Sequence, residues 1–141
     1  MSAIRDYKDL IAWQKAMDLV EEAYRISAHF PKEEVFGLRS QIRRAAVSIP
    51  SNVSEGSGRM TRDDFVRFLV MAAGSCNEVE TQALLSVRLK YTTDKIIVRL
   101  LGLCKDEQRL LRGLIQSLSA STKRGVSYQP PTSQSPRGTR N

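Results

Sequence analysis

Residues 94–118, DKIIVRLLGLCKDEQRLLRGLIQSL, carry the clearest structural pattern in this chain. An α-helix turns by about 100° per residue, and at that angle one line of side chains runs through the stretch: Ile97, Leu101, Cys104, Gln108, Leu111, Ile115 and Leu118. Ile96 and further leucines widen the apolar zone to nearly half the circumference, while basic side chains occupy the other half. The stretch therefore predicts an amphipathic helix, which Thr93-Asp94 opens.

The segment before Phe30-Pro31 predicts another helix, because a residue that precedes proline avoids the α region. Its apolar side chains form two neighbouring stripes: Leu10, Trp13, Met17, Val20, Tyr24 and Ser27 in one, and Ala16, Leu19, Ala23, Ile26 and Phe30 in the other. A core-facing helix of a bundle needs only about three-sevenths of its surface for the core. The excess on this helix and on the 94–118 helix favours burial against another subunit over a large internal core alone.

A further helix is expected from about Pro31 to Gly56 and Gly58, with a stripe at Leu38, Ile42, Ala45, Ile49 and Val53. Pro50 lies inside this pattern. A break there would leave Ile49 as a poor N-cap, so we predict one continuous helix that is kinked at Pro50. Thr61 is a good N-cap for the next helix, whose stripe is Phe65, Leu69, Ala72, Cys76, Val79, Ala83 and Val87.

These four segments predict an all-α fold, an antiparallel up-down-up-down four-helix bundle formed by residues 1–121. Periodicity ends after Ser121, and residues 122–141 are predicted to be a disordered basic tail. Cys76 and Cys104 are expected to be reduced core thiols. No apolar run is long enough for a membrane span, and the first residues lack the apolar core of a signal peptide. We expect a cytoplasmic protein.

The net charge of +7 is unevenly distributed. Residues 1–34 and 63–87 are net acidic, whereas residues 35–62, 88–120 and 121–141 are net basic. Segments of opposite sign attract one another within a bundle and leave basic faces for an anionic partner.

Several motifs resemble, in order, those of a bacterial family: Asp9-Leu10-x-x-Trp13-Gln14-Lys15-Ala16, Phe30-Pro31-x-Glu33, Gly37-Leu38-x-Ser40-Gln41-Ile42-Arg43-Arg44-Ala45-Ala46, Ser48-Ile49-Pro50-x-Asn52-Val53-x-Glu55-Gly56 and Glu78-x-Glu80-Thr81-Gln82. The family is the four helix bundle proteins, also called 23S ribosomal RNA intervening-sequence proteins, and the resemblance covers about residues 7–120. Val53 and Ser54 stand where relatives usually show Ile and Ala.

The resemblance implies a homopentameric ring of antiparallel bundles with a proline kink. A distant relative is the accessory variability determinant (Avd) of diversity-generating retroelements, which partners a reverse transcriptase and nucleic acid. The resemblance to it implies the same partners here, RNA or DNA and a reverse transcriptase, but nothing in the sequence separates a retroelement accessory from an intervening-sequence protein.

Basic side chains are the candidate contacts with nucleic acid: Arg39, Arg43, Arg44, Arg59, Arg62, Arg99, Lys105, Arg109, Arg112, Lys123 and Arg124. Arginine suits phosphate because its planar fork makes paired, charge-assisted hydrogen bonds. For Arg39 and Arg43, pairing with acids of the neighbouring helices is an equally weighted alternative. For Arg44, Arg59 and Arg62 that alternative carries less weight, and the basic half of the 94–118 helix is equally compatible with a solvated face. With few aromatic residues, and Trp13 and Tyr24 placed on the core stripe, binding is expected to be led by phosphate and to depend on salt.

Polar residues beside the stripes, Asn52, Glu55, Ser75, Glu78 and Gln82, are expected to form a network of hydrogen bonds between helices or subunits. A carboxylate metal site is disfavoured because its usual Glu-x-x-His pairs are missing and His29, the only histidine, ends the first helix. No motif supplies an activated nucleophile or a nucleotide loop. We therefore expect no enzyme, no metal and no cofactor. The predicted function is a non-enzymatic, homo-oligomeric nucleic-acid-binding accessory protein, and the alternative is a protein-interaction scaffold with no direct role on nucleic acid.

Overall fold

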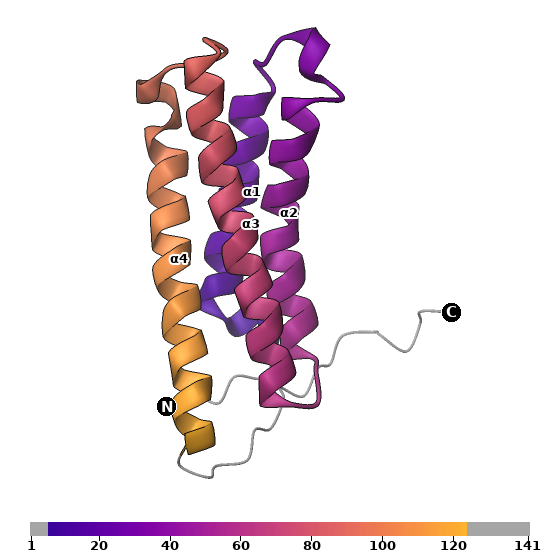
Figure 1. The fold of residues 1–141 in the computed structure, drawn as a ribbon, viewed down its shortest axis with the longest axis vertical. Helices are drawn as coiled ribbons and strands as arrows, with labels where there is room; N and C mark the ends of the chain where they lie inside the picture. Colours follow the sequence, from indigo (N-terminus) through magenta and orange to yellow (C-terminus); the bar gives the residue numbers. More distant parts are fainter. Residues whose placement is uncertain (1–5, 124–141) are drawn as a thin grey trace, which may run out of the picture.

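Four α-helices account for most of residues 6–123, the part of the chain that the computed structural model describes: α1 (Ile11–Ser27), α2 (Leu38–Ser57), α3 (Arg62–Arg88) and α4 (Asp94–Lys123). Two 3-10 turns, Tyr7–Asp9 and Lys32–Glu34, precede α1 and α2. No strand occurs within the described residues. The helices lie side by side and successive ones run in opposite directions (Figure 1). The predicted all-α fold of four helices is confirmed.

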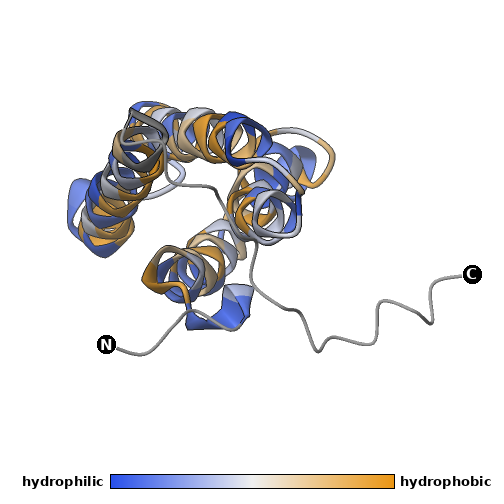
Figure 2. Cartoon of the chain, turned by 90° about the horizontal axis from the view of Figure 1, so that it is seen from below, coloured by the Kyte–Doolittle hydropathy of each residue, from blue (hydrophilic) through white to orange (hydrophobic). Residues whose placement is uncertain are grey.

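The core forms where the apolar stripes of the four helices meet. α1 packs against α2 and α4, and α3 packs against the same two helices. Seen along the bundle, apolar residues gather on the inner sides of the helices (Figure 2). The Ala16, Leu19, Ala23, Ile26 stripe of α1 is buried, as predicted. The second stripe of α1 is only partly buried: the prediction that Tyr24 lies in the core is wrong, because 40% of this side chain is exposed.

The start of α2 differs from the prediction. It begins at Leu38 rather than near Pro31, after the short 3-10 turn and Gly37. Glu34 caps the helix from outside, because its Oε1 accepts a hydrogen bond of 2.7 Å from the Leu38 amide. Its Oε2 accepts one of 2.7 Å from the Tyr91 hydroxyl at the α3–α4 turn. These bonds hold the pKa of Glu34 below its usual value and tie the two turns at one end of the bundle together.

α2 is continuous through Pro50, which is buried within it. Thr61 caps α3 as predicted: its hydroxyl accepts a hydrogen bond of 3.1 Å from the Asp64 amide. Thr93 likewise accepts one of 3.3 Å from the Ile96 amide at the start of α4. α4 continues to Lys123, so its end lies two residues beyond the predicted limit at Ser121. Residues 124–141, which hold the rest of the predicted tail, lie outside the described part.

The two cysteines are free and buried, and the Cys76 thiol lies 3.3 Å from the carbonyl oxygen of Cys104 across the α3–α4 contact. No helix among the described residues has the length and apolar content to cross a membrane.

Glu107 is the unexpected member of the core. It lies on α4, among Leu103, Cys104 and Leu111, and its side chain is fully buried. Neither carboxylate oxygen has a hydrogen-bond partner within residues 6–123. Burial, followed by the nearby Cys76 thiol, raises the pKa of Glu107 to about 8. The acid is therefore predominantly neutral at pH 7 in the folded protein.

Gly56 marks the closest approach of α2 to α3. A Cβ atom there would lie 2.6 Å from the Cβ of Phe68 and 3.3 Å from the carbonyl oxygen of Phe65, and atoms so near the backbone cannot move aside alone. We predict that Gly56→Ala destabilises the protein by about 1–3 kcal/mol through overpacking. Gly113→Ala, where nothing lies within 4 Å, is the matched control and should be neutral or stabilising. Urea unfolding followed by circular dichroism measures both, and equal stability of the two variants would contradict the close approach.

We predict that Glu107 makes the free energy of unfolding depend on pH. Its folded pKa of about 8 exceeds the ordinary glutamate value of 4.5, so the folded state binds the extra proton between these values. The stability that this proton contributes is fully present below pH 4.5 and is lost as pH rises toward 8, with a slope of up to ~1.4 kcal/mol per pH unit. Glu107→Gln should flatten this slope, whereas Glu78→Gln, at an exposed site on α3, should leave it unchanged. Urea unfolding at pH 5, 6.5 and 8, at one protein concentration, is the measurement. A wild-type pH profile in Glu107→Gln would rule out this role.

Candidate nucleic-acid interface

Arg39 and Arg43 of α2 hold the end of α1. The last turn of a helix leaves carbonyl groups without intrahelical partners. Arg43 donates from Nη2 to the carbonyl oxygen of Tyr24 at 3.2 Å, and from Nε to the hydroxyl of Ser27 at 2.8 Å. Arg39 donates from Nη2 to the carbonyl oxygen of Phe30 at 2.9 Å. Both guanidiniums thus bond to uncharged groups, rather than to the acids that the alternative interpretation of the sequence invoked.

The charge of these two arginines consequently remains. A helix C-terminus carries only a partial negative charge, which attracts a cation without cancelling it. A guanidinium has five N–H donors. The bonds to the end of α1 engage Nε and Nη2 of Arg43 and Nη2 of Arg39, so Nη1 of each remains available to an anion.

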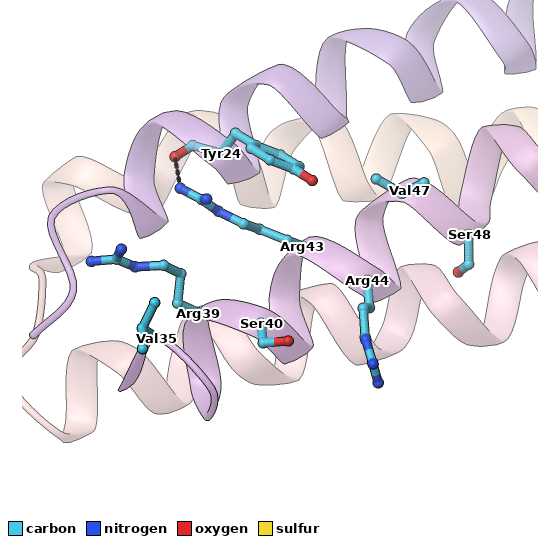
Figure 3. Close-up of a pocket in the computed structure, with 8 residues that line it drawn as sticks. All are labelled: Tyr24, Val35, Arg39, Ser40, Arg43, Arg44, Val47 and Ser48. Carbon is cyan, nitrogen blue, oxygen red and sulfur yellow. Dashed lines mark hydrogen bonds between the residues drawn. The ribbon is translucent and has the colours of Figure 1, made fainter. Parts of the chain in front are cut away.

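A groove of about 570 Å³ lies over this end of α2. We call it the α2 groove, and it is lined by Tyr24, Val35, Arg39, Ser40, Arg43, Arg44, Val47 and Ser48. The three arginines fan out from α2, and Arg43 reaches toward Tyr24 (Figure 3). Arg44 is exposed and has no partner within the described residues. No carboxylate is among the lining side chains, so the electrostatic potential of the α2 groove favours an anion.

The arginines at the α2–α3 turn are more engaged than the sequence suggested. Arg59 donates to Glu55 Oε1 at 2.9 Å, and its guanidinium carbon lies 4.7 Å from the centroid of the Phe68 ring. Arg67 approaches the same ring at 5.0 Å. Arg62 is half-buried and also has a partner in the chain. A partner for Arg59 on a neighbouring helix carried less weight in the sequence, and its carboxylate partner is instead Glu55, on α2 itself. The i, i+4 spacing of Glu55 and Arg59 is the sequence signal for this pair.

The basic side of α4 is largely open. Arg99 lies 3.7 Å from the buried carboxylate of Glu22, and Arg109 lies 3.6 Å from Asp106. Both of these arginines are mostly exposed. Asp106 is exposed as well, so the Arg109–Asp106 pair contributes little, whereas Glu22 is buried. Lys105 and Arg112 are exposed and have no partner among the residues described. The side chain of Lys123 and all of Arg124 lie outside the described part of the chain.

Glu22 has a structural role. It accepts hydrogen bonds from Arg25, at 2.9 Å and 2.5 Å. These bonds are the largest cause of a lowered pKa for Glu22. The positive charges of Arg25 and Arg99 lower the pKa further, and burial opposes them. Because Arg99 lies on α4, the carboxylate joins α1 to α4.

The five residues of the predicted polar network do not bond to one another in the described chain. Asn52 donates to the carbonyl oxygen of Ser48 at 2.8 Å, within α2, and Glu55 pairs with Arg59. Ser75 is buried and Glu78 is exposed, and the buried side-chain oxygen of Gln82 has no partner among the residues that the structure describes. Side-chain bonds from α4 to α3 come instead from Gln108, which donates to the carbonyl oxygen of Ala73 at 2.9 Å and to Asn77 at 2.8 Å.

No group of three or more potential metal ligands occurs among residues 6–123. What the arrangement offers chemically is electrostatic: a basic groove on α2 and a basic side of α4.

A solved structure supports this architecture. A protein of unknown function from the S23 ribosomal protein family of Bacteroides thetaiotaomicron VPI-5482 superposes with a TM-score of 0.68 at 23% sequence identity. The match covers 75% of this chain and 99% of that one, and at this identity it shows the fold alone. Among curated proteins, no sequence matches this chain.

The model of one protein family matches residues 8–113, which is most of the chain. The match includes α1, α2, α3 and the greater part of α4, and it includes all the residues that line the α2 groove. The chain belongs to the 23S rRNA-intervening sequence protein family.

Proposed function

We propose that this protein is a non-enzymatic accessory protein that self-associates and binds RNA or DNA through its basic faces. The observation that carries the proposal is the bonding of Arg39 and Arg43. Their guanidiniums are fixed by uncharged oxygens, and Arg44 beside them has no partner within the described residues. A polyanion binds to positive charges that are fixed in place and are not neutralised by carboxylates of the protein.

The expected contact is with the phosphate backbone. Arginine presents two parallel N–H donors to phosphate oxygens, and such contacts fix position without reading sequence. Lys105 and Arg112 on α4 supply a second exposed basic side. Binding should therefore show little sequence selectivity and should weaken steeply as salt is added.

Self-association is supported by apolar surface on the α3–α4 side. Leu84, Val98 and Leu101 line a groove of about 420 Å³ together with Gly102 and the charged residues Glu80 and Lys105, and 64% of Val98 is exposed. We propose that a second copy packs on the apolar side chains of this groove and leaves Lys105 at its edge accessible. We further propose that the assembly is the pentameric ring implied by the family, with α2 bent at Pro50. A ring repeats each basic patch, so a modest contact per subunit becomes a strong one for the oligomer.

A cytoplasmic location and a reverse transcriptase as protein partner, as in the retroelement accessories that the sequence distantly resembles, belong to the same proposal. The alternative is a protein-interaction scaffold in which the same apolar groove docks another protein. Binding that needs no nucleic acid and persists at high salt would favour the scaffold.

The salt dependence of binding tests the proposed function. The triple variant Arg44→Gln, Lys105→Gln, Arg112→Gln removes exposed cations that have no partner in the described chain. We expect its plot of log K against log salt, for the full-length protein and a fluorescein-labelled 20-nucleotide RNA, to be shallower by about one unit for each phosphate that the variant no longer neutralises. Fluorescence anisotropy between 50 and 200 mM salt measures the slope.

The matched control removes the same charge from the acidic first segment: Lys8→Gln, Lys15→Gln, Lys32→Gln, all at exposed positions. Its slope should stay close to that of the wild type. If both triple variants flatten the slope equally, the interaction reflects net charge alone, and if neither does, the basic faces are not the contact.

A further inference from the structure

We propose that the α2 groove is a subsite for one unpaired nucleotide, with a phosphate on Arg44 and Arg39 and the base against the stacked pair of Arg43 and Tyr24. The inference rests on the proposed function and deepens it. It assigns to this groove a preference for single-stranded nucleic acid over duplex.

The base side of the subsite is formed by Arg43 and Tyr24. The guanidinium carbon of Arg43 lies 4.4 Å from the centroid of the Tyr24 ring, which is a cation–π contact. Arg43 bonds to the Tyr24 carbonyl (Figure 3) and also to Ser27. These bonds fix the guanidinium, so its plane is held before any ligand arrives. Unpaired bases stack on aromatic rings and on arginine planes of this kind. Val35 and Val47, 43% and 40% exposed, add apolar wall.

The phosphate side is formed by the remaining donors. Arg44 is exposed, Nη1 of Arg39 has no acceptor in the described chain, and Ser40 lies between these two arginines along α2. No lining carboxylate competes for these donors. A single phosphate group could thus receive charge-assisted hydrogen bonds from two arginines.

The size of the groove fits one nucleotide rather than a helix. Its volume of about 570 Å³ lies within the range of pockets for small ligands, ~300–1,000 Å³. In a duplex, neighbouring pairs cover the base faces, so the Arg43–Tyr24 stack would find no partner there. Electrostatic attraction alone would favour the duplex, because a duplex carries the higher charge density. A preference for single strands therefore requires stacking and cannot arise from net charge.

The test compares two probes on the full-length protein at one low salt concentration: a labelled 20-nucleotide oligo-A RNA and the same strand paired with oligo-U. We expect the wild type to bind the single strand several-fold more tightly. Tyr24→Leu should weaken binding of the single strand by about five- to 100-fold, the range for losing one stacked base, and change duplex binding less than twofold. Phe36→Leu, at an aromatic that is 94% exposed and outside the groove, is the matched control and should keep the preference.

Competition on the wild-type protein gives a readout that is independent of the variants. Adenosine monophosphate should displace the single-stranded probe at a lower concentration than inorganic phosphate does. Equal displacement, or equal affinity for the two probes with no effect of Tyr24→Leu, overturns the subsite and leaves the proposed function intact. Failure of both probes to bind overturns the proposed function itself.

Discussion

The bonds from Arg39 and Arg43 to the end of α1 are the interaction on which this account depends. They satisfy carbonyl groups that the last turn of α1 and the following residues expose, and so they join α2 to α1. Their acceptors are uncharged, which distinguishes them from Arg59, whose charge a carboxylate partly offsets. One set of contacts thus stabilises the bundle, keeps two positive charges on its surface and fixes the guanidinium that lies over Tyr24.

The sequence predicted the parts of the fold that repeat or that have local chemistry. The stripe of the 94–118 segment, the Thr61 cap and the continuity of α2 through Pro50 all follow from residues near one another in the chain. The hydrogen-bond partners of Arg39 and Arg43 could not be predicted, because every residue has a carbonyl group and the sequence does not show which one lies near an arginine of another helix. The position of Tyr24 did not follow either, because a wide apolar arc gives no sign of which edge faces the core. Glu107 lies between Asp106 and Gln108 and resembles part of a polar face, although its angular position falls within the leucine zone.

The residues that match the family model include the basic surfaces described above. The matched residues 8–113 include the whole α2 groove and the exposed basic positions of α4 through Arg112. This region contains basic side chains without a carboxylate partner among the described residues, such as Arg44 and Arg112, together with the exposed ring of Tyr24. A separate groove with apolar walls lies on its α3–α4 side. In the core, by contrast, the Glu107 carboxyl has no hydrogen-bond partner in the described part of the chain, and burial raises its pKa to about 8, which favours the neutral acid. Electrostatic contact with a polyanion is the function that we propose for such an arrangement.

The most direct measurement is a titration of the arginine side-chain Nε–Hε signals by nuclear magnetic resonance while unlabelled single-stranded RNA is added. We expect the signals of Arg39, Arg43 and Arg44 to shift together and to saturate at the same RNA concentration. The signal of Arg67, which is exposed but paired with Asp64, should remain in place. Shifts that spare all three α2 arginines, with RNA bound, would contradict the account.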